Sequence, residues 1–190
     1  MTKIGIDLDE ILSDTLTSAI DCYKNTHNVS LNRETFTAKD YREIWGKIEN
    51  FWQSEYFKNT KPVKGAFEEL APLKKLGYEF YIITGRYNKY TTQTKEWLDK
   101  YYPNIFSGIY FANTFNTEGG TKKKSEICKN LGIEIFIEDD ELHIEDCSDA
   151  GIKVLILDHP WNKHKDVKNS IRAYSWKEMS EKINKIKNNI

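Results

Sequence analysis

Residues 4–14 read I-G-I-D-L-D-E-I-L-S-D. The short apolar run Ile4-Gly5-Ile6 is typical of a buried strand, and two acids, Asp7 and Asp9, follow it one residue apart. Because alternate residues of an extended chain point the same way, both carboxylates are expected on one side. They stand where the strand would end, which is where open α/β sheets bind ligands. A solvated strand end explains an isolated D-x-D more simply, so the later motifs decide its meaning.

Length and composition limit the class of protein. The chain has 190 residues, of which 39% are hydrophobic and 13% aromatic, enough for one core domain with an insertion. A net charge of −1 gives no general reason to expect binding to nucleic acid or to a membrane surface. The first strand leaves no room for a signal peptide, and no apolar run approaches a membrane span. Cys22, Cys128 and Cys147 form no C-x-x-C and resemble reduced, buried thiols, which favours a cytoplasmic protein.

Strand-like and helix-like segments alternate along most of the chain. Five strands with helical crossovers predict an α/β fold with a Rossmann-like parallel five-stranded sheet. The strands are predicted at residues 3–8, 79–83, 108–111, 135–137 and 153–157. The helices are predicted at residues 66–76, 91–101, 123–131, 142–150 and 175–187, and a loop at 113–121.

A long segment interrupts this alternation after the first strand. Residues 14–61 are mostly helical in pattern and rich in aromatic side chains, and they are too many for a simple crossover. We expect them to form an inserted helical cap. The core domain would then consist of residues 1–13 and 62–190.

Polar side chains also follow the later strands. Thr84 ends the second strand, Asp139 lies in the E-D-D that ends the fourth, and Lys124 opens the helix before it. Because the carboxyl ends of parallel strands meet at one edge of a sheet, these residues are expected in one crevice with Asp7 and Asp9.

The order D-x-D, T-G, K and D-D resembles that of the haloacid dehalogenase (HAD) superfamily. The opening D-L-D-E-I-L-S-D, the helical insertion and the later H-P-W-N resemble its 5′(3′)-deoxyribonucleotidase-like branch, although Glu10 stands where many members have Gly. The resemblance implies the strand order 5-4-1-2-3. It also implies a Mg²⁺-dependent phosphomonoester hydrolase that forms an aspartyl-phosphate, with a nucleoside monophosphate as the expected substrate.

The resemblance implies roles for the acids. Asp7 would be the nucleophile, and Asp9 would protonate the leaving oxygen and later activate water. Mg²⁺ would be held by the Asp7 carboxylate, the Asp9 backbone carbonyl and Asp139, since it prefers hard oxygen ligands. Asp140 or Glu138 could share the metal with Asp139, and an acidic helix cap is the structural alternative for the whole E-D-D.

It also implies roles for groups that contact phosphate. Thr84 and the Gly85 amide would bind a phosphoryl oxygen, and Lys124 would neutralise charge near Asp7. A helix cap is the alternative for Thr84, and Lys123 is the alternative for Lys124. Arg86 is a candidate substrate contact, with an exposed loop arginine as the alternative.

The insertion carries six aromatic residues within a short stretch. Most should pack in its own core, and one or two should hold the base of a nucleotide. We expect Trp45, Phe51 and Trp52 to be the leading candidates among Tyr41, Trp45, Phe51, Trp52, Tyr56 and Phe57. Asp14 is expected to cap the first helix of the insertion rather than to bind substrate.

The expected partner is a small phosphate ester, with no membrane and no stable nucleic-acid partner, and the oligomeric state is left open. Three alternatives remain from the residues alone: a sugar or other small-molecule phosphatase, a 3′-phosphatase of nucleic-acid ends, and a non-catalytic phosphate-binding module. The second acid, Asp9, argues against the binding module, because binding alone does not need a proton carrier.

Overall fold

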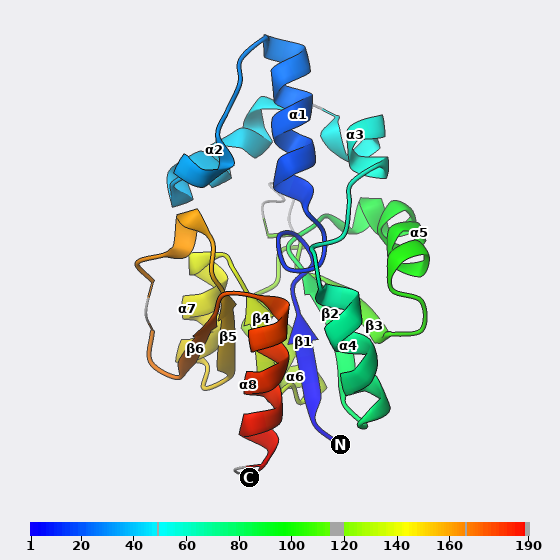
Figure 1. The fold of residues 1–190 in the computed structure, drawn as a ribbon, viewed down its shortest axis with the longest axis vertical. Helices are drawn as coiled ribbons and strands as arrows, with labels where there is room; N and C mark the ends of the chain where they lie inside the picture. The colour runs from blue at the N-terminus through cyan, green and yellow to red at the C-terminus, as the bar shows by residue number, and fades with distance from the viewer. Residues whose placement is uncertain (49, 115–119, 166, 189–190) are drawn as a thin grey trace.

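The computed structural model describes residues 1–48, 50–114, 120–165 and 167–188, so part of the loop predicted at 113–121 lies outside the described residues. Within them, six parallel strands form one sheet in the order β3-β2-β1-β4-β5-β6 (Figure 1). The order of the first five strands agrees with the expected 5-4-1-2-3. The strands are β1 (Lys3–Ile6), β2 (Glu79–Thr84), β3 (Phe106–Phe111), β4 (Ile135–Glu138), β5 (Lys153–Leu157) and β6 (Ser170–Ala173).

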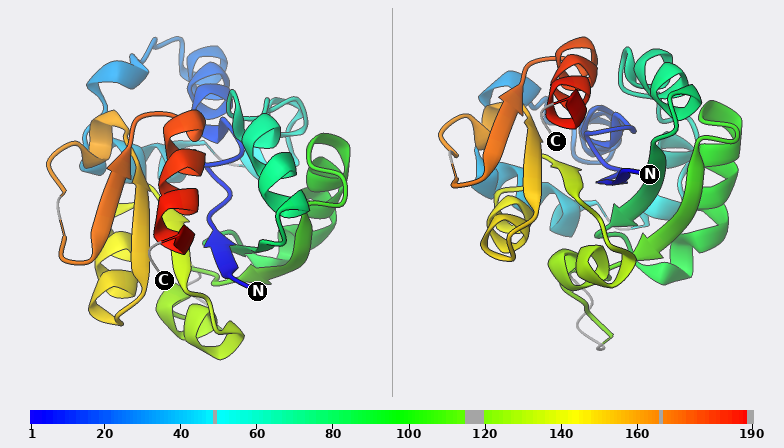
Figure 2. Two further views of the ribbon diagram at one scale, coloured as in Figure 1. Left: turned by 60° about the horizontal axis from the view of Figure 1, so that its bottom comes forward. Right: turned by 90° about the horizontal axis from the view of Figure 1, so that it is seen from below.

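Helices cover both faces of this sheet, as Figure 2 shows from below. Ile4 and Ile6 pack with the residues of α4 and α8, whereas Phe136 packs on the other face with those of α6 and α7. The three cysteines are free and buried. The helices are α4 (Ala66–Lys75), α5 (Thr91–Tyr101), α6 (Lys124–Leu131), α7 (Glu141–Asp149) and α8 (Trp176–Asn188).

The central strand β1 is tightly packed against its neighbours. A Cβ atom added to Gly5 would lie 2.9 Å from the side chain of Phe136 and 3.0 Å from that of Ile83. Glycine at this position therefore leaves room for side chains from the two strands that flank β1. The sheet order changes direction beside β1, so its carboxyl end lies at the switch point where doubly wound folds bind ligands.

Several details differ from the sequence-based expectation. The sheet has a sixth strand, β6, whose sequence S-I-R-A lacks the apolar run of a buried strand because it lies at a half-buried edge. The first strand ends at Ile6 rather than at residue 8. After it, the amides of Leu12 and Ser13 both donate to the carbonyl of Leu8, so the chain closes a compact loop.

The helical insertion, residues 15–58, lies over the carboxyl end of the sheet (Figure 1). Its core contains Leu16, Ile44, Phe51 and Phe57, so it buries apolar surface of its own. Two chain segments join the insertion to the sheet. They lie side by side and are linked to each other by backbone hydrogen bonds. Its elements are α1 (Thr15–His27), η1 (Arg33–Thr35), α2 (Ala38–Lys47), η2 (Phe51–Gln53) and α3 (Glu55–Lys58).

Among the described helices, none is both long enough and apolar enough to cross a bilayer.

Candidate active site

A buried lysine bridges two carboxylates at the carboxyl ends of the central strands. Lys124 is the first residue of α6, and its Nζ lies 2.5 Å from Oδ1 of Asp7 and 2.8 Å from Oε2 of Glu138. Lys123, the alternative, has an exposed side chain near Asp146 on the surface. The geometry therefore places Lys124, and not Lys123, at the strand ends.

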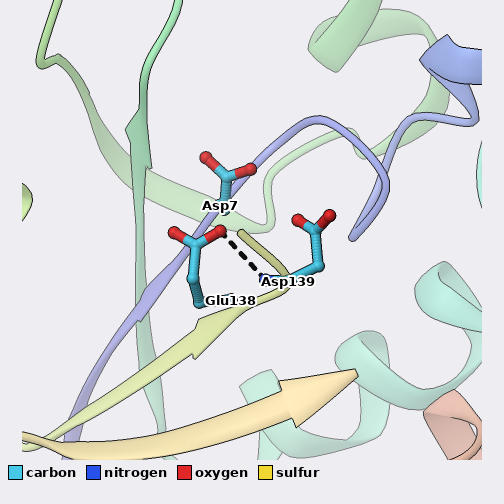
Figure 3. Close-up of side chains that lie close together, drawn as sticks. All are labelled: Asp7, Glu138 and Asp139. Carbon is cyan, nitrogen blue, oxygen red and sulfur yellow. Dashed lines mark hydrogen bonds between the residues drawn. The ribbon is translucent and has the colours of Figure 1, made fainter. Parts of the chain in front are cut away.

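Three carboxylates meet beside this lysine: Asp7, Glu138 and Asp139 each offer an oxygen within 4.8 Å of the others (Figure 3). The oxygens of Glu138 are already engaged, since they accept from Lys124 and from the amides of Asp139 and Asp140. Asp140 accepts from the amide of Leu142 at 2.8 Å and so caps α7. Asp7 and Asp139 are consequently the better placed pair to hold a cation.

The electrostatics of the cluster show why a cation fits. Burial raises the pKa of Asp7 to about 8, Glu138 and Asp9 add to this increase, and Lys124 opposes it. Burial and the neighbouring Glu138 also hold the pKa of Asp139 well above its ordinary value. Burial alone would lower the pKa of Lys124, but the two carboxylates beside it reverse this and raise it. A small hard cation such as Mg²⁺ would offset the burial and mutual repulsion of these carboxylates in their ionised form.

Asp9 lies in the loop after β1 and forms an ion pair with Arg86. Its Oδ1 accepts from Nη2 of Arg86 at 2.6 Å and from Oγ1 of Thr15 at 2.6 Å, and its Oδ2 accepts from Nε of Arg86 at 2.9 Å. The side chain of Arg86 is only 1% exposed. The alternative of an exposed loop arginine is therefore wrong, and the geometry brings Arg86 to Asp9 rather than into solvent.

The T-G-R segment follows β2 directly. Thr84 is fully buried, and its Oγ1 accepts from the amide of Arg86 at 3.2 Å. Gly85 lines the cavity described below, where an added Cβ atom would lie 3.0 Å from Oγ1 of Thr114. Glycine at this position therefore leaves room for the side chain of Thr114, and Gly85 forms part of the cavity lining.

A cavity of about 490 Å³ lies between the carboxyl ends of the strands and the helical insertion. Trp45 and Trp52 line it from the insertion, as expected. Phe51 does not line it: its side chain is 1% exposed and packs among the other aromatic rings of the insertion core. On the side of the sheet, the residues that line the cavity include Asp7, Asp9, Gly85, Arg86, Lys124, Glu138, Asp139 and Asp140.

The aromatic wall of this cavity continues from the insertion to the segment that follows β2. Trp45 stacks on Trp52 with ring centroids 5.6 Å apart, and Trp52 stacks on Tyr90 at 5.9 Å. Tyr90 in turn stacks on Tyr87 at 6.3 Å, and all four residues line the cavity. Sequence reasoning missed the two tyrosines, although the segment R-Y-N-K-Y directly after T-G was a visible signal.

Glu10 and Asp14 hold the insertion through Arg33. Glu10 adopts φ 64°, a conformation that favours Gly, and its buried carboxylate accepts from the amide of Leu16 and lies 2.6 Å from Nη2 of Arg33. Burial raises the pKa of Glu10 to about 7 against the opposing charge of Arg33. Asp14 stands at the N-cap of α1 but makes no side-chain capping bond. Its Oδ1 instead accepts from Nη1 of Arg33 at 2.5 Å, so the predicted N-cap position is confirmed but the side-chain capping bond is not made.

Comparisons with known proteins identify the family. The model of the family described as 5' nucleotidase, deoxy (pyrimidine), cytosolic type C protein (NT5C) matches residues 1–189. A candidate nucleotidase of Oceanobacillus iheyensis is 26% identical over 188 residues, which cover 93% of this chain and 96% of the relative.

Solved structures share the fold. A predicted phosphatase from Clostridium acetobutylicum has a TM-score of 0.71 and 15% identity, covering 97% of this chain and 98% of its own. A candidate HAD-hydrolase from Bacillus subtilis, determined bound to magnesium, has a TM-score of 0.65 and 13% identity, covering 96% and 98%. The chain therefore belongs to the 5' nucleotidase, deoxy (pyrimidine), cytosolic type C protein family and is a phosphoric monoester hydrolase with the HAD-superfamily fold.

Proposed function

We propose that the protein is a Mg²⁺-dependent nucleoside monophosphate phosphatase that acts in the cytoplasm through an aspartyl-phosphate on Asp7. The observation that carries the proposal is the position of Asp7. It is buried at the carboxyl end of the central strand, 2.5 Å from a buried lysine, on the floor of a cavity with an aromatic wall. A nucleophile, charge compensation and a flat binding surface therefore occur together in one site.

The reaction requires two displacements at phosphorus. A carboxylate oxygen of Asp7 would attack phosphorus as the ester P–O bond breaks, and Asp9 would give its proton to the departing oxygen. Asp9 would then take a proton from water, which attacks the phosphoenzyme and releases inorganic phosphate and free Asp7. Lys124 supports the first step because its ammonium favours the ionised form of Asp7.

The metal site follows from the same residues. Asp7 and Asp139 would hold Mg²⁺ through their carboxylates, with the Asp9 backbone carbonyl as the further ligand that the family resemblance implies. When bound, the cation would neutralise the charge of the carboxylates and of the phosphate. Trp161 donates from its indole Nε1 to Oδ2 of Asp139 at 2.9 Å, which orients that carboxylate. Thr84 and the Gly85 amide remain the proposed contacts for a phosphoryl oxygen.

The cavity wall supports a nucleotide over a small sugar phosphate. We propose that residues 14–61 act as a cap and that Trp45 and Trp52, together with Tyr87 and Tyr90, hold the base. Stacking of a base on an aromatic ring contributes about 1–3 kcal/mol. A cavity of about 490 Å³ is also in the range of small-ligand sites.

A substrate panel tests the proposal directly. Phosphate release would be measured with Mg²⁺ on 5′- and 3′-nucleoside monophosphates, sugar phosphates and a DNA oligonucleotide with a 3′-phosphate. We expect nucleoside monophosphates to have the highest kcat/KM, and the folded Asp7→Asn variant to lose at least about 10³-fold in kcat, because the nucleophile is gone. Near-normal turnover in folded Asp7→Asn would contradict the mechanism, and preference for a sugar phosphate would contradict the substrate class.

A further inference from the structure

Arg86 connects the insertion to Asp9. Its Nε and Nη2 donate to the two oxygens of Asp9, and its Nη1 donates to Oγ1 of Thr94 at 3.3 Å. The guanidinium carbon lies 5.0 Å from the ring centroid of Trp52 and 4.8 Å from that of Phe57, both from the insertion. A buried guanidinium held by both polar and aromatic contacts has little freedom to turn toward another group.

These contacts make the two oxygens of Asp9 unequal. Oδ1 accepts from Oγ1 of Thr15 and from Nη2 and Nε of Arg86, at 2.6, 2.6 and 3.2 Å. Oδ2 accepts from Nε of Arg86 alone, at 2.9 Å. Among the described residues, Oδ2 is therefore the oxygen with more capacity left for a further hydrogen bond.

We propose that Arg86 is a positioning residue that aims Oδ2 of Asp9 at the leaving oxygen of the substrate, and that the insertion keeps Arg86 in place. The inference rests on the proposed role of Asp9 as acid and base. It replaces the sequence-based expectation that Arg86 contacts the substrate itself. It also gives the insertion a part in proton transfer, because Trp52 and Phe57 cover the guanidinium.

The proposal separates substrates by their leaving groups. An alkoxide such as a nucleoside 5′-oxygen leaves poorly without a proton, whereas an acidic phenolate leaves well without one. Because kcat/KM reports only the steps up to the departure of the leaving group, the later attack of water does not obscure this difference. A misplaced Asp9 should therefore reduce kcat/KM more for esters of less acidic alcohols.

The main experiment measures kcat/KM for Arg86→Gln, Arg86→Lys and Asp9→Asn on phosphate monoesters that span a range of leaving-group pKa. For Arg86→Gln we expect a loss of about 10²-fold on a nucleotide and a small loss on an acidic aryl phosphate, within the usual contribution of acid–base catalysis. Arg86→Lys should lie between the wild type and Arg86→Gln, since a lysine keeps the charge without the two-point contact. In the Asp9→Asn background, Arg86→Gln should cause little further loss.

Arg33→Gln is the matched control, because Arg33 also links the insertion to the loop after β1 but contacts Glu10 and Asp14 instead of Asp9. The loss of kcat/KM in Arg33→Gln should be the same for all leaving groups. If Arg86→Gln lost the same factor in kcat/KM on every ester, and this loss were additive with that of Asp9→Asn, the inference would be overturned. Arg86 would then be a contact for the substrate phosphate. If Asp9→Asn itself shows no dependence on the leaving group, the proposed role of Asp9 fails first.

A second comparison leaves Arg86 in place and so does not depend on the folding of its variants. Phe51 and Phe57 are both 1% exposed in the core of the insertion, but of the two only Phe57 lies over the guanidinium. Phe57→Leu should reproduce the leaving-group dependence in weaker form, and Phe51→Leu should not. The same profile for both variants would contradict the proposed link between the insertion and Asp9.

Discussion

The indole Nε1 of Trp161 donates a hydrogen bond of 2.9 Å to Oδ2 of Asp139. The same ring stacks on Tyr41 of α2, at 4.7 Å between centroids, and on His159, which follows β5, at 4.5 Å. The orientation of a proposed metal ligand thus depends on a ring that is packed partly by the helical insertion.

Trp161→Phe should weaken metal binding without removing the ring stack. The variant loses the N–H that orients Asp139, and loss of such a partner typically costs about 10–100-fold in metal affinity. The Mg²⁺ concentration for half-maximal activity should rise accordingly. Trp97→Phe is the control, because Trp97 is equally buried but donates to the carbonyl of Thr60. An unchanged Mg²⁺ requirement in Trp161→Phe would contradict the role of this hydrogen bond.

Asp139→Asn and Asp140→Asn should differ although the residues are adjacent. Asp139→Asn should lower Mg²⁺ affinity, and excess Mg²⁺ should restore part of the activity. Asp140→Asn changes the cap of α7, where it accepts from the amide of Leu142, so it should affect thermal stability modestly and leave the Mg²⁺ requirement unchanged. Calorimetric titration with Mg²⁺ distinguishes them. The opposite pattern would move the metal ligand to Asp140.

Mg²⁺ should stabilise the protein more at about pH 8 than at about pH 6. Burial raises the pKa of Asp7 from 3.8 to about 8, so the metal-free folded state binds a proton that the unfolded chain has released over this range. The metal-free protein therefore loses stability as pH rises toward about 8, while the deprotonated carboxylates become available to the cation. Melting temperatures with Mg²⁺ and with EDTA at both pH values check this. A shift that is equal at both, or larger at the lower pH, would contradict it.

Trp45→Leu should reduce binding of the base selectively. Loss of a stacking contact worth about 1–3 kcal/mol should raise KM for a nucleotide about 10-fold, with little change for ribose 5-phosphate, which has no base. Trp45 is preferable to Trp52 for this test because Trp52 also covers Arg86. Phe51→Leu is the control for general damage to the insertion. Equal losses on both substrates in Trp45→Leu would favour a general small-molecule phosphatase.

The sequence by itself determined five of the six described strands and the expected position of Asp7 and Lys124 at their carboxyl ends. Strands can be predicted locally, because backbone hydrogen bonding and side-chain periodicity act over only a few residues. This applies to the apolar runs of β1, β2, β4 and β5 and to the turn residues between them. Asp7 directly follows β1 and Lys124 opens α6, so the sequence predicts both residues at the same end of the sheet. The edge strand β6 was missed for the same reason, because its four residues are only half-buried and carry no such pattern.

Only the tertiary structure decided which side chains face each other. Arg86 pairs with Asp9 across 77 residues of sequence, and Trp161 meets Asp139 across 22. It also separated Trp45, which lines the cavity, from Phe51, which fills the core of the insertion. These outcomes depend on how the insertion packs over the sheet, and the burial of an arginine or a phenylalanine depends on neighbours that are remote in the chain.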